Sequence, residues 1–312
     1  MQDYALGDEN RQQVHFLKWI FLAFLLLLIL GFAKKNFFSG KNQTVTSPLS
    51  DNFFSFITPK QKDPQILIAE IKKLLEKTNG SYSLYVYDLT NNQGFGINET
   101  TIFTAASVNK IPILASLYYF ANAGEINLDQ QVTLQASDIQ DYGTGSLRYD
   151  PPGTTYSVKT LARLMMEQSD NTAAYILGRE ILNFEKIQKL IDSWGLTQTD
   201  MENNKTSLSD MTKILIKMYR GEVTNKALTL EMLGFMDESD FEDRLGLLLP
   251  KTVKIYHKTG DEIGLIHDIG IINPEKHAYI LGVFTSDITD EKIAKETIGQ
   301  ISRLVYDWMQ GK

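Results

Sequence analysis

The sequence predicts an α+β domain in which an antiparallel sheet is assembled from both ends of the domain, with a helical subdomain inserted between them. Strand-like segments occur at residues 81–89 and again between 252 and 285, and the segments between them have helical spacing. A third observation is a long apolar run near the N-terminus. We therefore divide the chain into a cytoplasmic tail (1–15), a transmembrane helix (16–33), a linker (34–63) and a folded domain (64–312).

The apolar run over residues 19–33 contains no charged residue. With Phe16 and Leu17 it reaches roughly 17 residues, the lower limit for crossing a bilayer. A buried core helix would normally keep a polar stripe, and this run has none. A cleaved signal peptide is the alternative, because Gly31 and Ala33 form an acceptable cleavage site. The polar residues that precede the run favour an uncleaved anchor.

The folded domain begins at Pro64, where the composition changes. Residues Ile66 to Lys77 have helical spacing, and Ser81 to Leu89 alternate as a strand before a turn at 91–94. A final amphipathic helix runs from Asp290 to about Met309. Between these, the pattern predicts helices at 107–122, 158–168, 171–182, 184–194, 207–219 and 227–236, and strands at 252–258, 266–272 and 278–285.

Composition excludes several classes of function. The chain has no cysteine, which excludes disulfides, thiolate nucleophiles and Cys-ligated zinc. Its four histidines include no pair at i, i+4, so we expect no metal and no organic cofactor. The net charge is −7 and no basic stripe is present, which argues against a nucleic acid partner.

Ser107 and Lys110 are the first candidate catalytic pair. Three residues apart on a helix, their side chains would lie on one face, about one turn apart. A neutral lysine amine could then accept the serine proton and activate a hydroxyl that is otherwise a weak nucleophile. The pattern by itself is weak, because Ser-x-x-Lys occurs often by chance.

Two further segments have ordinary structural explanations when taken singly. Ser169-Asp170-Asn171 lies between two predicted helices, where all three residue types are common helix caps. Lys258-Thr259-Gly260 lies at the end of a predicted strand, where a turn would be unremarkable.

Taken together and in this order, the three motifs resemble those of the class A β-lactamases and penicillin-recognising serine hydrolases. The resemblance covers about residues 64–312, and Gly143-Thr-Gly-Ser146 supports it. It implies the β-lactamase-like fold and an acyl-transfer reaction without a cofactor.

The resemblance also assigns roles to residues. It implies that Ser107 is the acylated nucleophile and Lys110 its proton acceptor. Ser169 would relay the proton to the leaving nitrogen, and Asn171 would bind the amide side chain of the substrate. The backbone N–H groups of Ser107 and Asp261 would form the oxyanion hole.

Further residues are matched to the substrate side of the cleft. Lys258 and Thr259 resemble the family's residues that contact the substrate carboxylate. Gly260 would let the strand approach the ligand closely. Tyr142 lies about where the family has an aromatic residue at the cleft mouth, although a packed surface tyrosine is an equal alternative. Asp170 is expected to point inward as a structural support.

One departure from the family pattern concerns release of the acyl-enzyme. Class A β-lactamases activate the releasing water with a Glu in an Ω-shaped loop. Here the corresponding loop, 195–207, looks shortened, and the Glu-x-x-x-Asn pattern is absent. Glu202 is the only nearby candidate for a deacylation base, and a surface Glu in a turn is the alternative. The family's basic residue opposite the Lys258 strand could be Arg244, His257 or His267, and we leave it unassigned.

We therefore expect a single-pass, membrane-anchored serine hydrolase with a monomeric catalytic domain outside the cytoplasm. A β-lactam or a peptidoglycan-like compound is the expected substrate, and antibiotic degradation the expected role. A D-alanyl-D-alanine-type peptidase or esterase is an alternative, and a non-catalytic penicillin-binding sensor is another. The orientation across the membrane rests on the resemblance and not on charge.

Overall fold

The computed structural model describes residues 63–273 and 277–311. The described residues form one compact unit that begins at Asp63. The predicted tail, the predicted transmembrane helix and nearly all of the predicted linker lie outside the described residues, so they stay predictions. No helix within the described ranges combines the length and the apolar character needed to cross a membrane.

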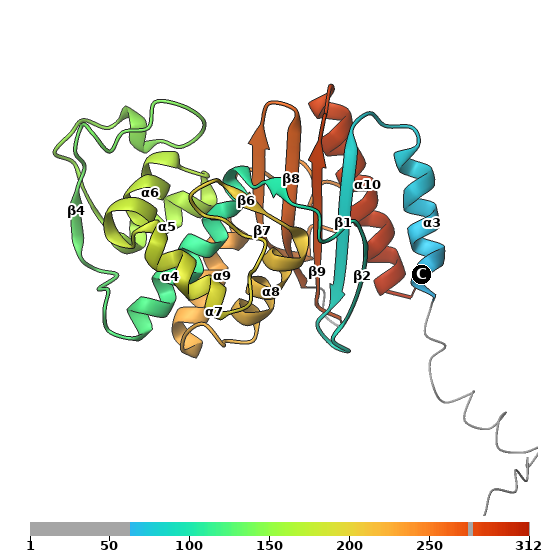
Figure 1. Cartoon of the computed structure of the whole chain (residues 1–312), viewed down its shortest axis with the longest axis horizontal. Coiled ribbons are helices and arrows are strands. Elements are labelled where there is room, and N and C mark those ends of the chain that lie inside the picture. The colour runs from blue at the N-terminus through green and yellow to red at the C-terminus, as the bar shows by residue number, and fades with distance from the viewer. Residues whose placement is uncertain (1–62, 274–276, 312) are drawn as a thin grey trace, which may run out of the picture. The chain divides into compact units, whose positions relative to one another are not determined.

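A five-stranded antiparallel sheet forms the centre of the domain, as the sequence predicts (Figure 1). Its spatial order is β2-β1-β9-β8-β7. The first two strands therefore pair with the last three, and residue 84 lies opposite residue 283. The strands are β1 (Ser81–Asp88), β2 (Gln93–Ile97), β7 (Lys254–Glu262), β8 (Leu265–Asn273) and β9 (Tyr279–Ser286).

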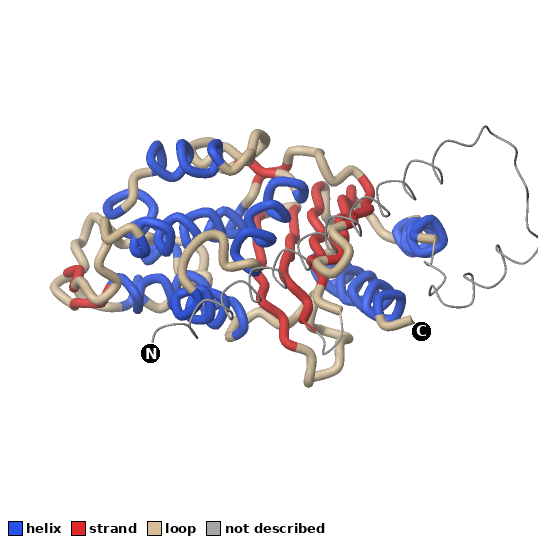
Figure 2. Tube along the Cα trace, turned by 90° about the horizontal axis from the view of Figure 1, so that it is seen from below, coloured by secondary structure: helices blue, strands red, loops and turns tan. Residues whose placement is uncertain are grey.

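Each face of the sheet packs into a different core because side chains alternate along a strand. On β9, Ile280 and Phe284 join the core of the helical subdomain. Leu281 and Val283 point the other way and join a second core with the two terminal helices. Those helices, α3 (Pro64–Leu75) and α10 (Glu291–Met309), lie side by side over that face (Figures 1 and 2).

The helical subdomain covers the opposite face, and α8 contacts β1, β8 and β9 directly (Figure 1). Two short two-stranded ladders accompany it, β3 (Phe103–Thr104) with β6 (Lys205–Thr206) and β4 (Gln131–Thr133) with β5 (Thr155–Ser157). The helices are α4 (Lys110–Asn122), α5 (Val158–Glu167), α6 (Asn171–Tyr175), α7 (Phe184–Ser193), α8 (Leu208–Tyr219) and α9 (Lys226–Asp237).

Side-chain caps explain why the helices begin where they do. At the N-terminus of every helix named above except α4, an Asp, Asn or Ser side chain accepts a hydrogen bond from a backbone N–H of the first turn, which is worth about 1 kcal/mol per cap. The capping residues are Asp63, Ser157, Asp170, Asn183, Ser207, Asn225 and Asp290.

Two predicted helices are not continuous α-helices. The stretch predicted at 107–122 consists of a 3₁₀ turn, Ala106–Asn109, followed by α4. The stretch predicted at 171–182 consists of α6 followed by a π-helical segment, Ile176–Ile181. Spacing of apolar residues does not distinguish these variants from an α-helix, and both 3₁₀ and π segments are frequent near functional sites.

His257, a buried residue of β7, links this strand to β8 and to the loop that precedes β7. His257 Nδ1 lies 2.8 Å from Asp268 Oδ1, and His257 Nε2 lies 3.3 Å from Glu242 Oε1. Burial by itself favours the neutral ring, but the two carboxylates outweigh it and raise the pKa of His257 from 6.5 to about 9. The folded protein therefore holds a charged histidine at neutral pH.

This raised pKa predicts a loss of stability at alkaline pH. The stability contributed by charged His257 is fully present below pH 6.5, the pKa of histidine in the unfolded chain, and is lost as the pH rises through about 9, its pKa in the folded protein. We expect the free energy of unfolding to fall by about 2–3 kcal/mol across this window through His257 alone. Urea unfolding of the wild type and His257→Gln from pH 6 to pH 10 measures it. Parallel pH profiles for the two proteins would contradict the prediction.

Candidate active site

A cleft of about 650 Å³ lies where the sheet meets the helical subdomain. It brings together residues that are far apart in the sequence, from the 3₁₀ turn, from α6 and from the end of β7. The predicted site residues that line it are Ser107, Lys110, Tyr142, Asn171, Glu202 and Asp261.

Lys110 is the centre of the hydrogen-bond network in this cleft. Its Nζ lies 2.9 Å from Ser107 Oγ and 3.0 Å from Ser169 Oγ. It also donates to the backbone carbonyl of Ser169 at 2.7 Å and to Oδ1 of Asn171 at 2.8 Å. One buried amine thus contacts both serine hydroxyls, and it is positioned to exchange protons with either of them.

Burial changes the acid–base behaviour of Lys110. Its side chain is almost fully buried, which lowers its pKa well below 10.5, and the charge of Lys258 lowers it further. Asp170 acts in the opposite direction. A lysine with a lowered pKa can be neutral at physiological pH, which is the form that accepts a proton from a serine hydroxyl.

Lys258 lies beneath the cleft on β7. Its residue is 1% exposed, and its Nζ donates to the backbone carbonyl of Thr259 at 3.1 Å. Burial lowers its pKa to about 7 against the opposing effect of Asp268. A bound anion would favour the protonated form, because opposite charges stabilise each other more strongly away from water.

Ser169 has a strained backbone conformation, and the hydrogen bonds of its neighbour Asp170 hold this turn in place. Ser169 has φ of 54°, in the left-handed region that residues other than glycine seldom adopt. Asp170 is buried, and its carboxylate accepts hydrogen bonds from the backbone N–H groups of Ala173 and Leu147, both at 2.9 Å. Asp170 therefore lies inward, as predicted, and fixes the turn that presents Ser169 to Lys110.

Gly260 allows a close approach between β7 and the turn that carries Ser107, and its predicted approach to a ligand stays a prediction. A Cβ at this position would lie 3.0 Å from Val108 Cγ2 and 3.1 Å from the carbonyl oxygen of Ala105. The glycine therefore lets β7 pack against the turn that carries Ser107. Ala106 in that turn has φ of 47°, so the nucleophile follows a strained residue.

Tyr142 and Asn171 form the far wall of the cleft. Tyr142 is 63% exposed, and its backbone carbonyl accepts a hydrogen bond from Asn171 Nδ2 at 3.1 Å. Since Asn171 Oδ1 accepts from Lys110, the whole amide is oriented by its neighbours. The exposed ring of Tyr142 is free to contact a bound molecule at the cleft mouth.

Glu202 lines the cleft, but its carboxylate is already bound. Arg179 donates to both of its oxygens, at 2.9 and 3.2 Å. The guanidinium also lies over the ring of Phe184, 4.2 Å from its centroid. A general base needs a lone pair directed at the attacking water, and in this arrangement Arg179 takes one lone pair of each oxygen and fixes the orientation of the carboxylate.

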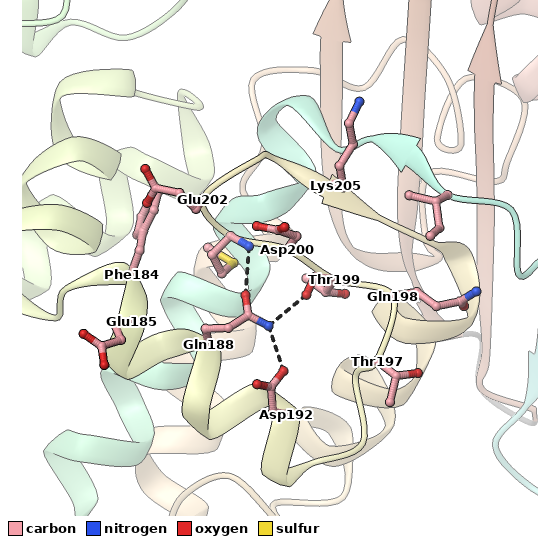
Figure 3. Close-up of a pocket in the computed structure, with 12 residues that line it drawn as sticks. Phe184, Glu185, Gln188, Asp192, Thr197, Gln198, Thr199, Asp200, Glu202 and Lys205 are labelled. Atoms are coloured by element: carbon pink, nitrogen blue, oxygen red, sulfur yellow. Dashed lines mark hydrogen bonds between the residues drawn. The ribbon is translucent and has the colours of Figure 1, made fainter.

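The short loop that carries Glu202 is fixed by one side chain of α7, Gln188 (Figure 3). Gln188 Oε1 accepts a hydrogen bond from the backbone N–H of Met201 at 2.9 Å. Its Nε2 donates to the carbonyl of Thr199 at 2.9 Å and to Asp192 at 2.7 Å. These bonds lie in a surface hollow beside the active-site cleft, and those to Met201 and Thr199 hold the loop against α7.

The three candidates for the basic residue lie in different places. Arg244 lies at the β7 end of the cleft, where its Nη2 donates to Asp261 at 2.9 Å. His257 points away, toward Asp268. His267 is fully buried, its Nε2 donating to the carbonyl of Thr104, and burial lowers its pKa to about 4. Only Arg244 is therefore close to the substrate side.

Comparison with known proteins agrees with this arrangement. A family model described as "Beta-lactamase enzyme family" matches residues 66–309. The chain belongs to the beta-lactamase enzyme family. The match confirms the resemblance drawn from the three motifs and identifies the protein as a hydrolase of C–N bonds.

Relatives and solved structures of this family are similar along most of the chain. "Beta-lactamase 3" of Bacillus cereus is 23% identical over 256 residues, covering 76% of this chain and 80% of the relative. A beta-lactamase of Phocaeicola vulgatus is also 23% identical, covering 77% and 84%. The structure of PBP-A has a TM-score of 0.74 at 26% identity, covering 81% of this chain and 99% of its own.

Sequence reasoning missed two residues that shape this β-lactamase-family site. Arg179 gave no signal, because nothing in the local pattern shows that a π-helical turn brings it to Glu202. Asn109 lies inside the Ser-x-x-Lys motif, and its Nδ2 donates to Asn204 Oδ1 at 2.8 Å, joining the nucleophile turn to the short loop. Its place within the motif was the one available hint.

The charge on Lys258 predicts a measurable effect on Lys110. Because Lys258 lowers the pKa of Lys110, we expect Lys258→Gln to move the acid limb of the acylation rate to higher pH. The pH dependence of acylation by a β-lactam measures this shift. Lys254→Gln, which removes an exposed lysine of the same strand, is the control. An unchanged midpoint in Lys258→Gln would show that the coupling is absent.

Proposed function

We propose that this protein is a serine hydrolase acylated at Ser107 by β-lactams and related amides. The observation that carries the proposal is the position of Lys110 Nζ, within 3.0 Å of both Ser107 Oγ and Ser169 Oγ. This places a buried amine between a nucleophile and a second proton carrier.

The proposed reaction has two steps. Lys110 takes the proton from Ser107 as its oxygen attacks the carbonyl carbon. The C–N bond then breaks, and the leaving nitrogen takes a proton from the Ser169 hydroxyl, which regains one from Lys110. In the second step, water attacks the ester and releases the acid and the free serine. The backbone N–H groups of Ser107 and Asp261 would stabilise the oxyanion in both steps.

Substrate recognition is proposed for the residues around this pair. Asn171 would bind the amide side chain of the acyl group, and Tyr142 would cover it at the cleft mouth. Lys258 and the Thr259 hydroxyl would bind the substrate carboxylate, although Thr259 is only 2% exposed and would act from the floor of the site.

The state of Glu202 supports slow release of the acyl group. Its two oxygens are paired with Arg179, so the short loop offers no free carboxylate in the cleft from this residue. An acyl-enzyme complex with penicillin G is known for a variant of PBP-A, which is 25% identical to this chain. The same observation favours a second candidate function, a D-alanyl peptidase or esterase whose acyl group leaves more readily than an opened β-lactam. A non-catalytic sensor is disfavoured, because Ser107, Lys110 and Ser169 are assembled for proton transfer.

The first experiment mixes the full-length protein with a chromogenic β-lactam and follows absorbance and intact mass together. We expect one covalent adduct per chain, formed within minutes and persisting longer than the absorbance burst. Ser107→Ala should lose the adduct entirely. Neither adduct nor turnover in the wild type would reject the β-lactam proposal and direct the search to D-amino-acid peptides and esters.

Glu202→Gln in the same assay shows whether this carboxylate takes part in release. Since Arg179 occupies both oxygens, we expect the adduct lifetime to change by less than about threefold. Fast turnover in the wild type and a trapped adduct in Glu202→Gln would instead identify Glu202 as the deacylation base, and the protein as an efficient β-lactamase.

We propose, from the sequence, that residues 16–33 anchor the protein in the membrane with the catalytic domain outside the cytoplasm. The apolar run of 19–33 is the support for the anchor, and the family's extracytoplasmic substrates are the support for its orientation. Protease added to intact cells should remove the catalytic domain, whereas a protein recovered with the soluble cytoplasmic fraction would refute the proposal.

A further inference from the structure

Arg244 is a buried cation at the β7 end of the cleft, and each of its three nitrogens donates a hydrogen bond. Its Nε donates to Asp243 Oδ1 at 2.9 Å and its Nη1 donates to the backbone carbonyl of His267 at 3.0 Å. Its Nη2 donates to Asp261 Oδ1 at 2.9 Å. Asp243 is half exposed and also pairs with Lys295, and the His267 carbonyl is buried, so Asp261 is the one of these three partners that lines the cleft.

Asp261 covers this cation. The Arg244 side chain is 1% exposed, whereas the Asp261 side chain is 44% exposed and lines the cleft. A molecule in the cleft therefore meets a carboxylate where the guanidinium would otherwise be accessible. Asp261 directly follows Lys258-Thr259-Gly260, the segment to which the proposed function assigns the substrate carboxylate.

The two carboxylates would compete for the same donors. A guanidinium binds a carboxylate best when two parallel N–H groups are available, and Nη2 of Arg244 already donates to Asp261. A substrate carboxylate beside Lys258 would also be repelled by the charge of Asp261. A substrate without a carboxylate would experience neither effect.

We propose that Asp261 is a specificity-determining residue that covers Arg244 and weakens the recognition of carboxylate-bearing substrates relative to neutral ones. This inference rests on the proposed function, because it assumes that the substrate carboxylate lies near Lys258. It predicts that masking the substrate carboxylate reduces the acylation rate less in this protein than it would without Asp261.

Acylation by benzylpenicillin and by its methyl ester tests the inference, because the two differ only in the carboxylate. The second-order acylation constant of each is measured by intact mass on the full-length wild type and on Asp261→Asn. We expect the ratio of the free acid to the ester to rise about tenfold in the variant. Both compounds are measured at pH 5.5, where Lys258 is charged. Because the protonation of Lys110 then affects both acylation constants equally, it does not change their ratio.

Glu262→Gln is the matched control. It removes one negative charge from the next residue along the strand, and no hydrogen bond or ion pair joins Glu262 to Arg244 within the part of the chain that the structure describes. In this control the ratio should change by less than roughly a factor of two, because solvent and salt screen an exposed charge. An equal rise in both variants would overturn the inference, since the effect would then be a general one of charge. Asp261→Ser provides a second test should Asp261→Asn fail to fold.

An anion titration separates failure of this inference from failure of the proposed function. Sulfate at about 20 mM should raise the melting temperature of Asp261→Ser by roughly 2–4 °C more than that of the wild type, because the shorter side chain no longer covers the Arg244 donors. Equal shifts would overturn the inference. If neither penicillin compound acylates the wild type, the proposed function fails, and the sulfate result alone decides whether Asp261 covers Arg244.

Discussion

The site depends on keeping one lysine amine buried among oxygen atoms. Lys110 has hydrogen bonds to four of them, contributed by Ser107, Ser169 and Asn171, and these come from two segments on opposite sides of the cleft. An amine in this position is costly to keep charged and inexpensive to keep neutral. The helical subdomain excludes water around it, and the sheet supplies the second cation, Lys258, that shifts the balance further. The fold therefore serves to hold a weak base where it can act on a serine.

Much of this arrangement follows from local sequence rules. Alternation predicted the strands, apolar spacing predicted the helices, and the three motifs predicted which residues meet around Lys110. The inward position of Asp170 was also predictable, since a capping aspartate accepts from its own helix. These features depend on neighbours in sequence or on a recurring pattern of residue types, so a single chain reveals them.

Other features depend on contacts that no local pattern records. Gly260 also lies against the strained turn at Ala106, a neighbour that only the folded sheet brings close. Glu202 was a candidate base by position, but Arg179 reaches it through a π-helical turn that apolar spacing does not distinguish from an α-helix. The choice among Arg244, His257 and His267 likewise required the geometry of β7 and β8, because all three are buried and Arg244 is the one that pairs with a cleft residue, Asp261.

The order of strands in the sheet has a consequence for how the chain folds. β1 is made early and its partner β9 is made near the end of synthesis, so residue 84 waits for residue 283 before the central pairing can close. Contacts between distant parts of a chain slow folding, because loop entropy is lost before they form. Until the last strands are made, one edge of β1 has no hydrogen-bonding partner, and a chain interrupted before β7 lacks Lys258. The enzyme thus assembles its nucleophile and its second cation only on completion, and an interrupted chain would hold a serine without the lysine environment that activates it.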